Sequence, residues 1–137
     1  MNSPRSRPDA KNVVDIDDTY PTQATVPAGG NAVVCDILCP GGLKPILKKI
    51  GNVVNDGTGG SYITWSLLVN GAAWPRLNAI ANELSDPAKP EDYLPYEDSF
   101  GSSAHVQLVA YNSDGAKSHT VVGRLVIWYE DRNAQNN

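Results

Sequence analysis

The sequence is poor in the residues on which disulfide-rich, metal-binding and membrane proteins depend. Its 137 residues include only two cysteines and two histidines. Its longest uncharged apolar runs are far shorter than the roughly 18 residues that a membrane-spanning helix needs. Residues 1–12 contain no apolar stretch, which predicts that the chain carries no secretory signal peptide. These shortages argue against a membrane protein and against a small domain held together by disulfides.

Positive charge is scarce as well. Lys and Arg number 11 against 15 Asp and Glu, which gives a net charge of −4. The basic residues are scattered, apart from Arg5 with Arg7 and Lys44 with Lys48 and Lys49. Nucleic-acid binding needs a dense basic face, because its affinity comes largely from neutralising phosphates. We therefore expect neither nucleic acid nor a membrane as a partner.

The two cysteines, Cys35 and Cys39, lie four positions apart in the strand-like run NAVVCDILCP. Residues with this spacing in a strand lie roughly 13 Å apart. A disulfide requires Cα atoms within roughly 7 Å of each other. We expect two free, partly buried thiols and a protein that folds in a reducing cytoplasm.

Apolar residues recur with the two-residue period of β-strands. The clearest example is Tyr62–Asn70, in which Ile63, Trp65 and Leu67 share one face and Asn70-Gly71 gives a hairpin signal. Further strands are expected at 22–26, 31–39, 105–112 and 120–129. The run 43–55 fits a strand or a helix, and Pro45 and Gly51 favour the strand. A short helix is expected at Leu77–Leu84.

Seven or eight short strands joined by Gly, Pro and Asn turns predict an all-β protein. The long irregular connection from about residue 73 to residue 100 suits a jelly-roll-like antiparallel β-sandwich, which we expect over residues 20–130. Residues 1–19 are polar and predict a flexible N-terminal arm. Residues 131–137 predict a polar C-terminal tail.

The expected last strand, Thr120–Tyr129, is apolar on both faces. Leu125 and Ile127 share one face, whereas Val122, Val126 and Trp128 lie on the other. A sandwich core covers only one of these faces, and large exposed apolar patches usually mark interfaces. We therefore predict that Val122, Val126 and Trp128 contribute to an interface in a homo-oligomer.

Two patterns suggest chemistry. Asp15, Asp17 and Thr19 form a DxDxT pattern, which resembles the nucleophile motif of haloacid-dehalogenase-type phosphatases. That motif belongs at the end of a buried parallel strand, and the chain shows no βαβ alternation. His105 and His119 lack the H-x-H pair and the further ligands of a cupin-type metal site. We expect no catalytic residue, no cofactor and no metal site.

Aromatic residues raise the separate possibility of sugar binding, since their rings can stack on sugar rings. Most of them are expected in the core or in interfaces. Trp74, in a turn before Pro75, is the best candidate for an exposed ligand contact.

Four runs carry a family resemblance: VPAGG, ITWSLLVNG, AHVQLVAYN and VVGRLVIWYE. Together, over about residues 26–130, they resemble the small jelly-roll virion proteins of tailed bacteriophages, which include capsid decoration proteins and head-, collar- or spike-associated proteins. The resemblance implies a trimer and a terminal arm, here residues 1–19, that docks on the shell or on a neighbouring subunit.

The function we expect is that of a non-enzymatic structural protein of a bacteriophage particle, most plausibly capsid decoration or stabilisation. Its partners would be further copies of itself and the major capsid protein or another virion protein, and it would reside in the virion after assembly in the host cytoplasm. The first alternative is a carbohydrate- or receptor-binding domain of a phage fibre or spike. The second is a small metal-dependent enzyme.

Overall fold

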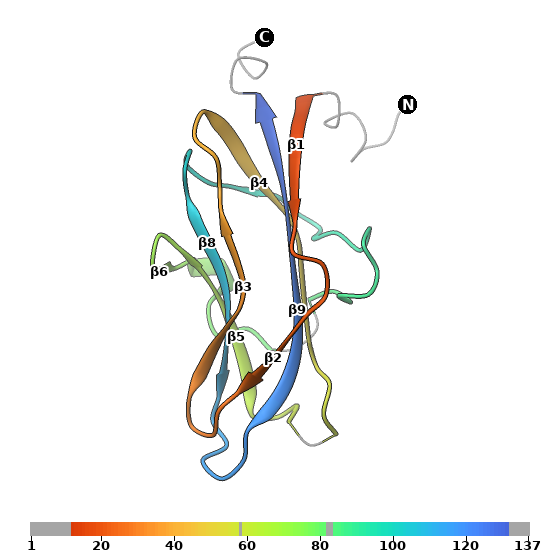
Figure 1. The fold of residues 1–137 in the computed structure, drawn as a ribbon, viewed down its shortest axis with the longest axis vertical. Coiled ribbons are helices and arrows are strands. Elements are labelled where there is room, and N and C mark those ends of the chain that lie inside the picture. The colour runs from red at the N-terminus through yellow and green to blue at the C-terminus, as the bar shows by residue number, and fades with distance from the viewer. Residues whose placement is uncertain (1–11, 58, 82–83, 132–137) are drawn as a thin grey trace.

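Two antiparallel β-sheets pack face to face in a computed structural model that describes residues 12–57, 59–81 and 84–131 (Figure 1). Sheet A contains β1 (Val13–Asp18), β2 (Thr22–Val26), β4 (Leu43–Val54), β7 (Asp98–Ser99) and β9 (His119–Asp131). Sheet B contains β3 (Asn31–Leu38), β5 (Ile63–Val69), β6 (Ala72–Ala73) and β8 (His105–Asn112). The predicted all-β antiparallel sandwich is confirmed.

The strands pair in the pattern of one long hairpin folded over on itself. The first strands, β1 and β2, pair with the last strand, β9. In the same way β3 pairs with β8, β4 with β7, and β5 with β6. Pairing of β4 with β9 and of β5 with β8 completes the two sheets, whose orders are β1-β9-β4-β7 and β3-β8-β5-β6. Most connections between consecutive long strands therefore cross from one sheet to the other.

Residues 43–54 form strand β4, as the strand interpretation of this run predicted. The predicted helix at Leu77–Leu84 is wrong over its described part. A 3-10 turn, η2 (Pro75–Leu77), ends at the first residue of the predicted helix. Ile80 instead exchanges two backbone hydrogen bonds with Trp65, at 2.8 and 2.9 Å. The apolar residues of this stretch have helical spacing, but the backbone groups of Ile80 are paired with β5 of sheet B instead.

The prediction of a flexible arm over residues 1–19 is wrong for residues 13–18. Residues 13–18 form strand β1, which takes its ladder hydrogen bonds from β9. Two of its acidic side chains have partners there, because Asp17 accepts a hydrogen bond from the Tyr129 hydroxyl and Asp18 forms an ion pair with Arg124. Residues 1–11 of that arm and 132–137 of the predicted tail lie outside the described residues, and Asp131 ends β9.

The core lies between the sheets. Trp65, Leu67 and Leu108 of sheet B meet Leu125 and Ile127 of sheet A, and none of these side chains is exposed. Cys35 and Cys39 are free and buried beside them, as predicted. Burial raises the pKa of Cys35 to about 11. Because the thiolate is the reactive form, this residue is a packing group and not a nucleophile.

The sheets approach each other most closely at Gly123 of β9. A Cβ atom there would lie 2.7 Å from Val34 Cγ1 and 3.2 Å from Leu108 Cδ2, both from sheet B. Neither contact leaves room for a methyl group, because the two side chains are themselves held in the core.

We expect Gly123→Ala to lower the free energy of unfolding by about 1–3 kcal/mol, the usual range for overpacking a core. Urea denaturation would measure the loss. Gly101→Ala is the matched control, since a Cβ atom at Gly101 meets nothing within 4 Å. Equal stabilities of the two variants would contradict the close approach of the sheets.

Candidate functional surfaces

A β-bulge in β4 determines what the outer face of sheet A carries. Leu47 and Ile50 both belong to the core, although positions three apart in a regular strand face opposite sides. The pairing with β9 shifts its register between Leu47 and Lys49, which accounts for this. The extra residue leaves both Lys48 and Lys49 on the outer face.

Lys49 is completely buried on that face. Its Nζ donates hydrogen bonds to Ser85 Oγ at 2.8 Å, to the Asp86 carbonyl oxygen at 2.8 Å and to the Asp92 carbonyl oxygen at 3.0 Å. Three acceptors satisfy all three protons of an ammonium group. Burial lowers the pKa of Lys49, and the charge of Asp92 offsets this only in part.

The acceptors of Lys49 belong to a segment that we call the covering loop (residues 84–97), which lies over the outer face of sheet A (Figure 1). Its backbone bonds directly to β4, from Leu94 N to the Lys48 carbonyl at 2.9 Å. Gly51 permits the approach, since a Cβ atom there would lie 2.7 Å from Pro87 Cα.

Arg124 of β9 is the second buried cation under this loop. Its guanidinium donates to both carboxylate oxygens of Asp18, at 2.9 and 2.6 Å, and to the Pro87 carbonyl at 2.9 Å. Burial alone would raise the pKa of Asp18, but hydrogen bonds from Arg124 and from the Tyr20 N–H outweigh it and hold the pKa below its ordinary value. One side chain thus joins β1, β9 and the covering loop.

The predicted interface residues of β9 are mostly buried within the chain. Trp128 lies under the covering loop, with Tyr93 against it edge-on at 5.7 Å between ring centroids and Lys48 Nζ 4.6 Å from its centroid. Val126 is also buried, and Val122 is half-buried. The prediction that these residues need a neighbouring subunit is wrong for Val126 and Trp128, because both are already buried in the single chain.

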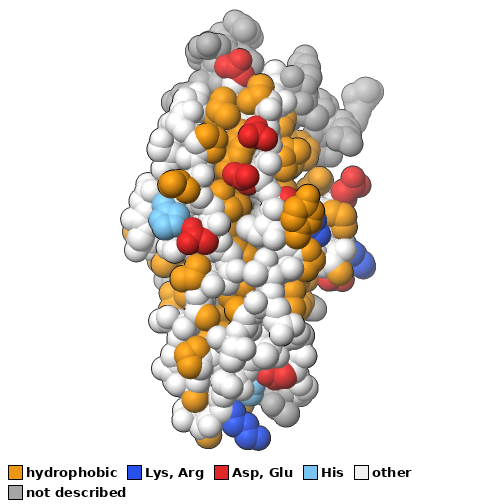
Figure 2. All heavy atoms as spheres, viewed as in Figure 1, with side chains coloured by type: hydrophobic (Ala, Val, Ile, Leu, Met, Phe, Trp, Pro, Cys, Tyr) orange, Lys and Arg blue, Asp and Glu red, His pale blue; other side chains and the backbone are white. Residues whose placement is uncertain are grey.

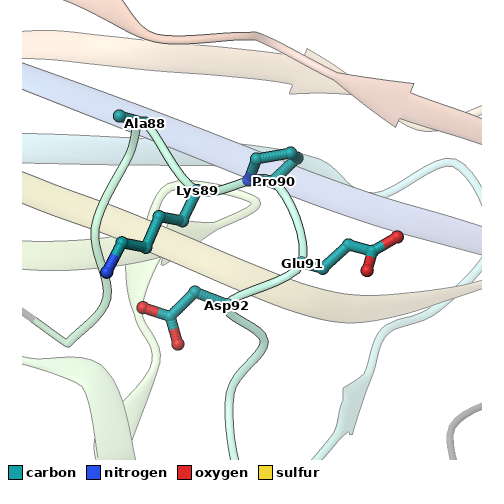
Figure 3. A pocket seen from close by; sticks show the side chains of 5 residues that line it. All are labelled: Ala88, Lys89, Pro90, Glu91 and Asp92. Atoms are coloured by element: carbon teal, nitrogen blue, oxygen red, sulfur yellow. The ribbon is translucent and has the colours of Figure 1, made fainter.

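The covering loop itself is hollowed on its solvent side. The hollow measures about 550 Å³ and is lined by Ala88, Lys89, Pro90, Glu91 and Asp92. In Figure 3 the side chains of Lys89 and Asp92 point to one side of the loop and Glu91 points to the other. All five residues come from one short segment, so the hollow is the fold of a single loop and no second element contributes a wall.

Trp74, the predicted ligand contact, is half-buried. Its ring meets Phe100 edge-on at 4.9 Å between centroids, and it packs against the core cluster. Its indole therefore fills the rim of the sandwich, and only part of it faces solvent.

The two histidines differ sharply in environment. His105 is half-exposed and pairs with Asp36 on the outer face of sheet B. His119 is buried, with Nδ1 3.1 Å from an Asp56 carboxylate oxygen and Nε2 2.9 Å from Asp114 Oδ2. The hydrogen bond to Asp114 raises the pKa of His119, and Asp56 adds to the effect.

With a carboxylate at each ring nitrogen, His119 is an imidazolium that donates two hydrogen bonds. It holds the segment after β4 against the turn between β8 and β9. Gly59 closes over it, since a Cβ atom there would lie 2.9 Å from His119 Cγ. Neither nitrogen is available to act as a base, so the group is an ionic clamp and not a catalytic dyad.

The acidic residues of the DxDxT pattern lie on an antiparallel edge strand, β1, rather than at the end of a parallel one. Asp15 is exposed and accepts a hydrogen bond from the Ile16 N–H, whereas Asp17 accepts one from Tyr129 at 2.6 Å. Thr19 bonds to Cys35 Sγ and to the Leu125 N–H. These contacts stabilise the sandwich and do not converge on one point.

Large apolar side chains are exposed where the edges of the two sheets run side by side. Val14 and Ile16 of β1 are 57% and 49% exposed, and Val33 and Leu38 of β3 are 50% and 73% exposed. We call these four residues the apolar edge surface. Figure 2 shows apolar side chains running down this face between scattered acidic ones.

The described residues contain neither a cluster of metal ligands nor a membrane-spanning helix. Within 12–57, 59–81 and 84–131, no group of three or more His, Cys, Asp or Glu side chains is arranged to hold a metal ion. Over the same residues, no helix is long and apolar enough to cross a membrane.

No protein-family model matches the sequence, and a comparison with curated protein sequences gives no match either.

The first prediction from these surfaces concerns Arg124. Arg124→Met removes a buried cation, which leaves Asp18 without its counter-charge and takes away the donor to the Pro87 carbonyl, so we expect a loss of stability on the order of 3 kcal/mol. Hydrogen exchange should show that the loss is accompanied by faster exchange in the covering loop. Lys89→Met, an exposed change in the same loop, is the control and should leave both quantities nearly unchanged. Unaltered exchange in Arg124→Met would show that the loop is held by other contacts.

The second prediction concerns how the free energy of unfolding depends on pH. Because the folded state raises the pKa of His119, the stabilisation it provides is fully present below about pH 6.5, the ordinary pKa of histidine, and is lost as pH rises through the folded-state pKa. The free energy of unfolding of the parent, minus that of His119→Gln, should therefore fall as the pH rises above about 6.5 and through the folded-state pKa. Taking the difference removes the effect of other buried groups, Lys49 among them.

A difference between parent and His119→Gln that stays constant with pH would rule out the ionic clamp.

Proposed function

We propose that the chain is a non-enzymatic structural protein of a bacteriophage particle that stabilises or decorates the capsid. The proposal takes the sandwich to be a jelly roll. The strand pairing supports this, because a jelly roll is two Greek keys in two packed sheets and arises when a long hairpin is rolled up. Rolling up a long hairpin pairs the first strand with the last and each later strand with its counterpart from the other end. The pairs β1–β9, β3–β8, β4–β7 and β5–β6 follow this pattern.

The observation that carries the proposal is the apolar edge surface. Single exposed apolar residues are ordinary, but four of the large exposed ones, Val14, Ile16, Val33 and Leu38, all lie on the edge strands β1 and β3. The edges are close together here, since Thr19, just after β1, bonds to Cys35 of β3 at 3.5 Å. Such a surface is typical of a protein that is covered by a partner.

The strand edges on this surface are also open. Within the described residues no strand pairs with the outer edge of β1 or with that of β3. Unpaired edges present backbone donors and acceptors to another chain. The acidic side chains of β1 oppose pairing of β1 with another β1, which favours contact with a different surface of the next subunit or with the shell.

The action of such a protein is mechanical. The sandwich is a rigid block, and burial of the apolar edge surface adds contact area between neighbouring shell proteins. Only the surplus after ordering of the contacting groups appears as affinity. We expect self-association in a symmetric oligomer, with a trimer as the expectation from the family resemblance.

The double variant Val14→Ser/Ile16→Ser tests this role. We expect light scattering to give the parent a native mass that is a multiple of 14.7 kDa, and to give the variant a mass closer to a single chain. The parent should also co-sediment with particles of the phage whose genome encodes it, and the double variant should do so much less.

Leu84→Ser is the matched control, because Leu84 is exposed but lies on the covering loop, away from β1. A parent that is monomeric and does not sediment with the particles would overturn the proposal. So would a double variant that keeps its circular-dichroism spectrum and still binds like the parent.

A further inference from the structure

A second hollow lies at the end of the sandwich opposite the start of β1 and the end of β9 (Figure 1). It measures about 430 Å³ and is lined by Ser61, Tyr62, Asp114, Ala116 and Lys117. This volume falls within the range of small-molecule sites, about 300–1,000 Å³. Unlike the hollow of the covering loop, it is built from two segments far apart in the sequence, one before β5 and the other the turn between β8 and β9.

The floor of this hollow is rigid. The Tyr62 carbonyl accepts hydrogen bonds from the Ser113 N–H at 3.0 Å and from its hydroxyl at 3.2 Å. The Tyr62 ring stacks on His119, with centroids 5.6 Å apart and planes 10° from parallel. Because the ring is still 41% exposed, it offers a fixed aromatic surface to the hollow.

The polar groups of the hollow are fixed as well. Asp114 Oδ2 accepts a hydrogen bond from His119 at 2.9 Å, and Oδ1 accepts from the Ala116 N–H at 2.9 Å and the Lys117 N–H at 3.3 Å. A carboxylate oxygen can accept more than one hydrogen bond, so Asp114 retains capacity for a ligand donor. Ser61 and Lys117 are exposed at the rim and add a hydroxyl and an ammonium group.

Charge at this end balances. Lys117 and the His119 imidazolium are positive, and Asp56 and Asp114 are negative, which gives a sum of zero. Figure 2 shows basic, acidic and histidine side chains next to one another at this end of the molecule. A strongly charged ligand would meet its own sign as closely as the opposite one, so the balance favours a neutral ligand.

We infer that this hollow binds the ring of a neutral sugar. One face of a pyranose is largely C–H and would lie on Tyr62, while its hydroxyl groups are donors to the Asp114 carboxylate and acceptors from Lys117 and Ser61. An apolar platform with a few fixed donors and acceptors is the composition expected of a small-ligand site. The inference does not depend on the role proposed for the apolar edge surface, which uses other residues.

The experiment is a titration of the isotope-labelled full chain with a panel of free glucose, galactose, mannose, N-acetylglucosamine, maltose and lactose, followed by amide chemical shifts. We expect at least one sugar to give saturable shifts that map to Ser61, Tyr62 and residues 113–118. In Tyr62→Ala the dissociation constant should rise about tenfold or more. Tyr96→Ala, which removes an exposed tyrosine of the covering loop, should bind like the parent.

Lys117→Ala is a second variant at the hollow, and it truncates an exposed side chain while it keeps the backbone hydrogen bonds of the turn. It should weaken binding of the same sugar even if Tyr62→Ala fails to fold. Three results would overturn the inference: no saturable shift with any of the six sugars, shifts that map elsewhere, or equal affinities of parent and both hollow variants.

Discussion

The pairing of β4 with β9 is the interaction on which the rest of the structure depends. It runs from Leu43 opposite Asp131 to Val54 opposite Val121, and its one irregularity is the bulge at Lys48. The inward side of this pair supplies Leu47, Ile50, Leu125 and Ile127 to the core. The outward side carries the buried cations Lys49 and Arg124, which could not remain there without acceptors. Asp18 of β1 provides acceptors for Arg124, and the covering loop provides the others through the Ser85 hydroxyl and three backbone carbonyl groups, so the two cations hold the loop on the sheet.

The sequence allowed the fold class to be predicted because alternation is a local signal. In Tyr62–Asn70 the residues Ile63, Trp65 and Leu67 occupy the face that the period-2 pattern assigns to the core. The same reasoning led to the prediction that the second apolar face of β9 is covered by a neighbouring subunit. Its second apolar face does need cover, but periodicity says nothing of where the cover comes from, and the chain supplies it for Val126 and Trp128.

The candidate surfaces were harder to predict, because they depend on residues that meet only in the folded chain. His119 and Asp114 are near each other in the sequence, but Asp56 arrives from a segment more than sixty residues earlier. The adjacent pair Lys48-Lys49 in an apolar run was a usable signal, since two neighbouring lysines in a regular buried strand would place one in the core, and a bulge avoids this. Residues 13–18 were predicted to belong to an arm because acidic side chains are usually solvated, whereas here Arg124 forms an ion pair with Asp18 and Tyr129 donates a hydrogen bond to Asp17.

The pairing of β1 with β9 has a mechanical consequence. The two strands are antiparallel, so the chain enters the sandwich at Val13 and leaves it at Asp131 on the same end. A force applied through these two points would peel β1 from β9 and load their hydrogen bonds one after another, which is a weak geometry for bearing tension. A load applied through the sides of the sandwich would instead be shared by both sheets. If the protein reinforces a shell, it therefore has to carry stress through its lateral surfaces, and its chain ends are suited to tethering rather than to bearing load.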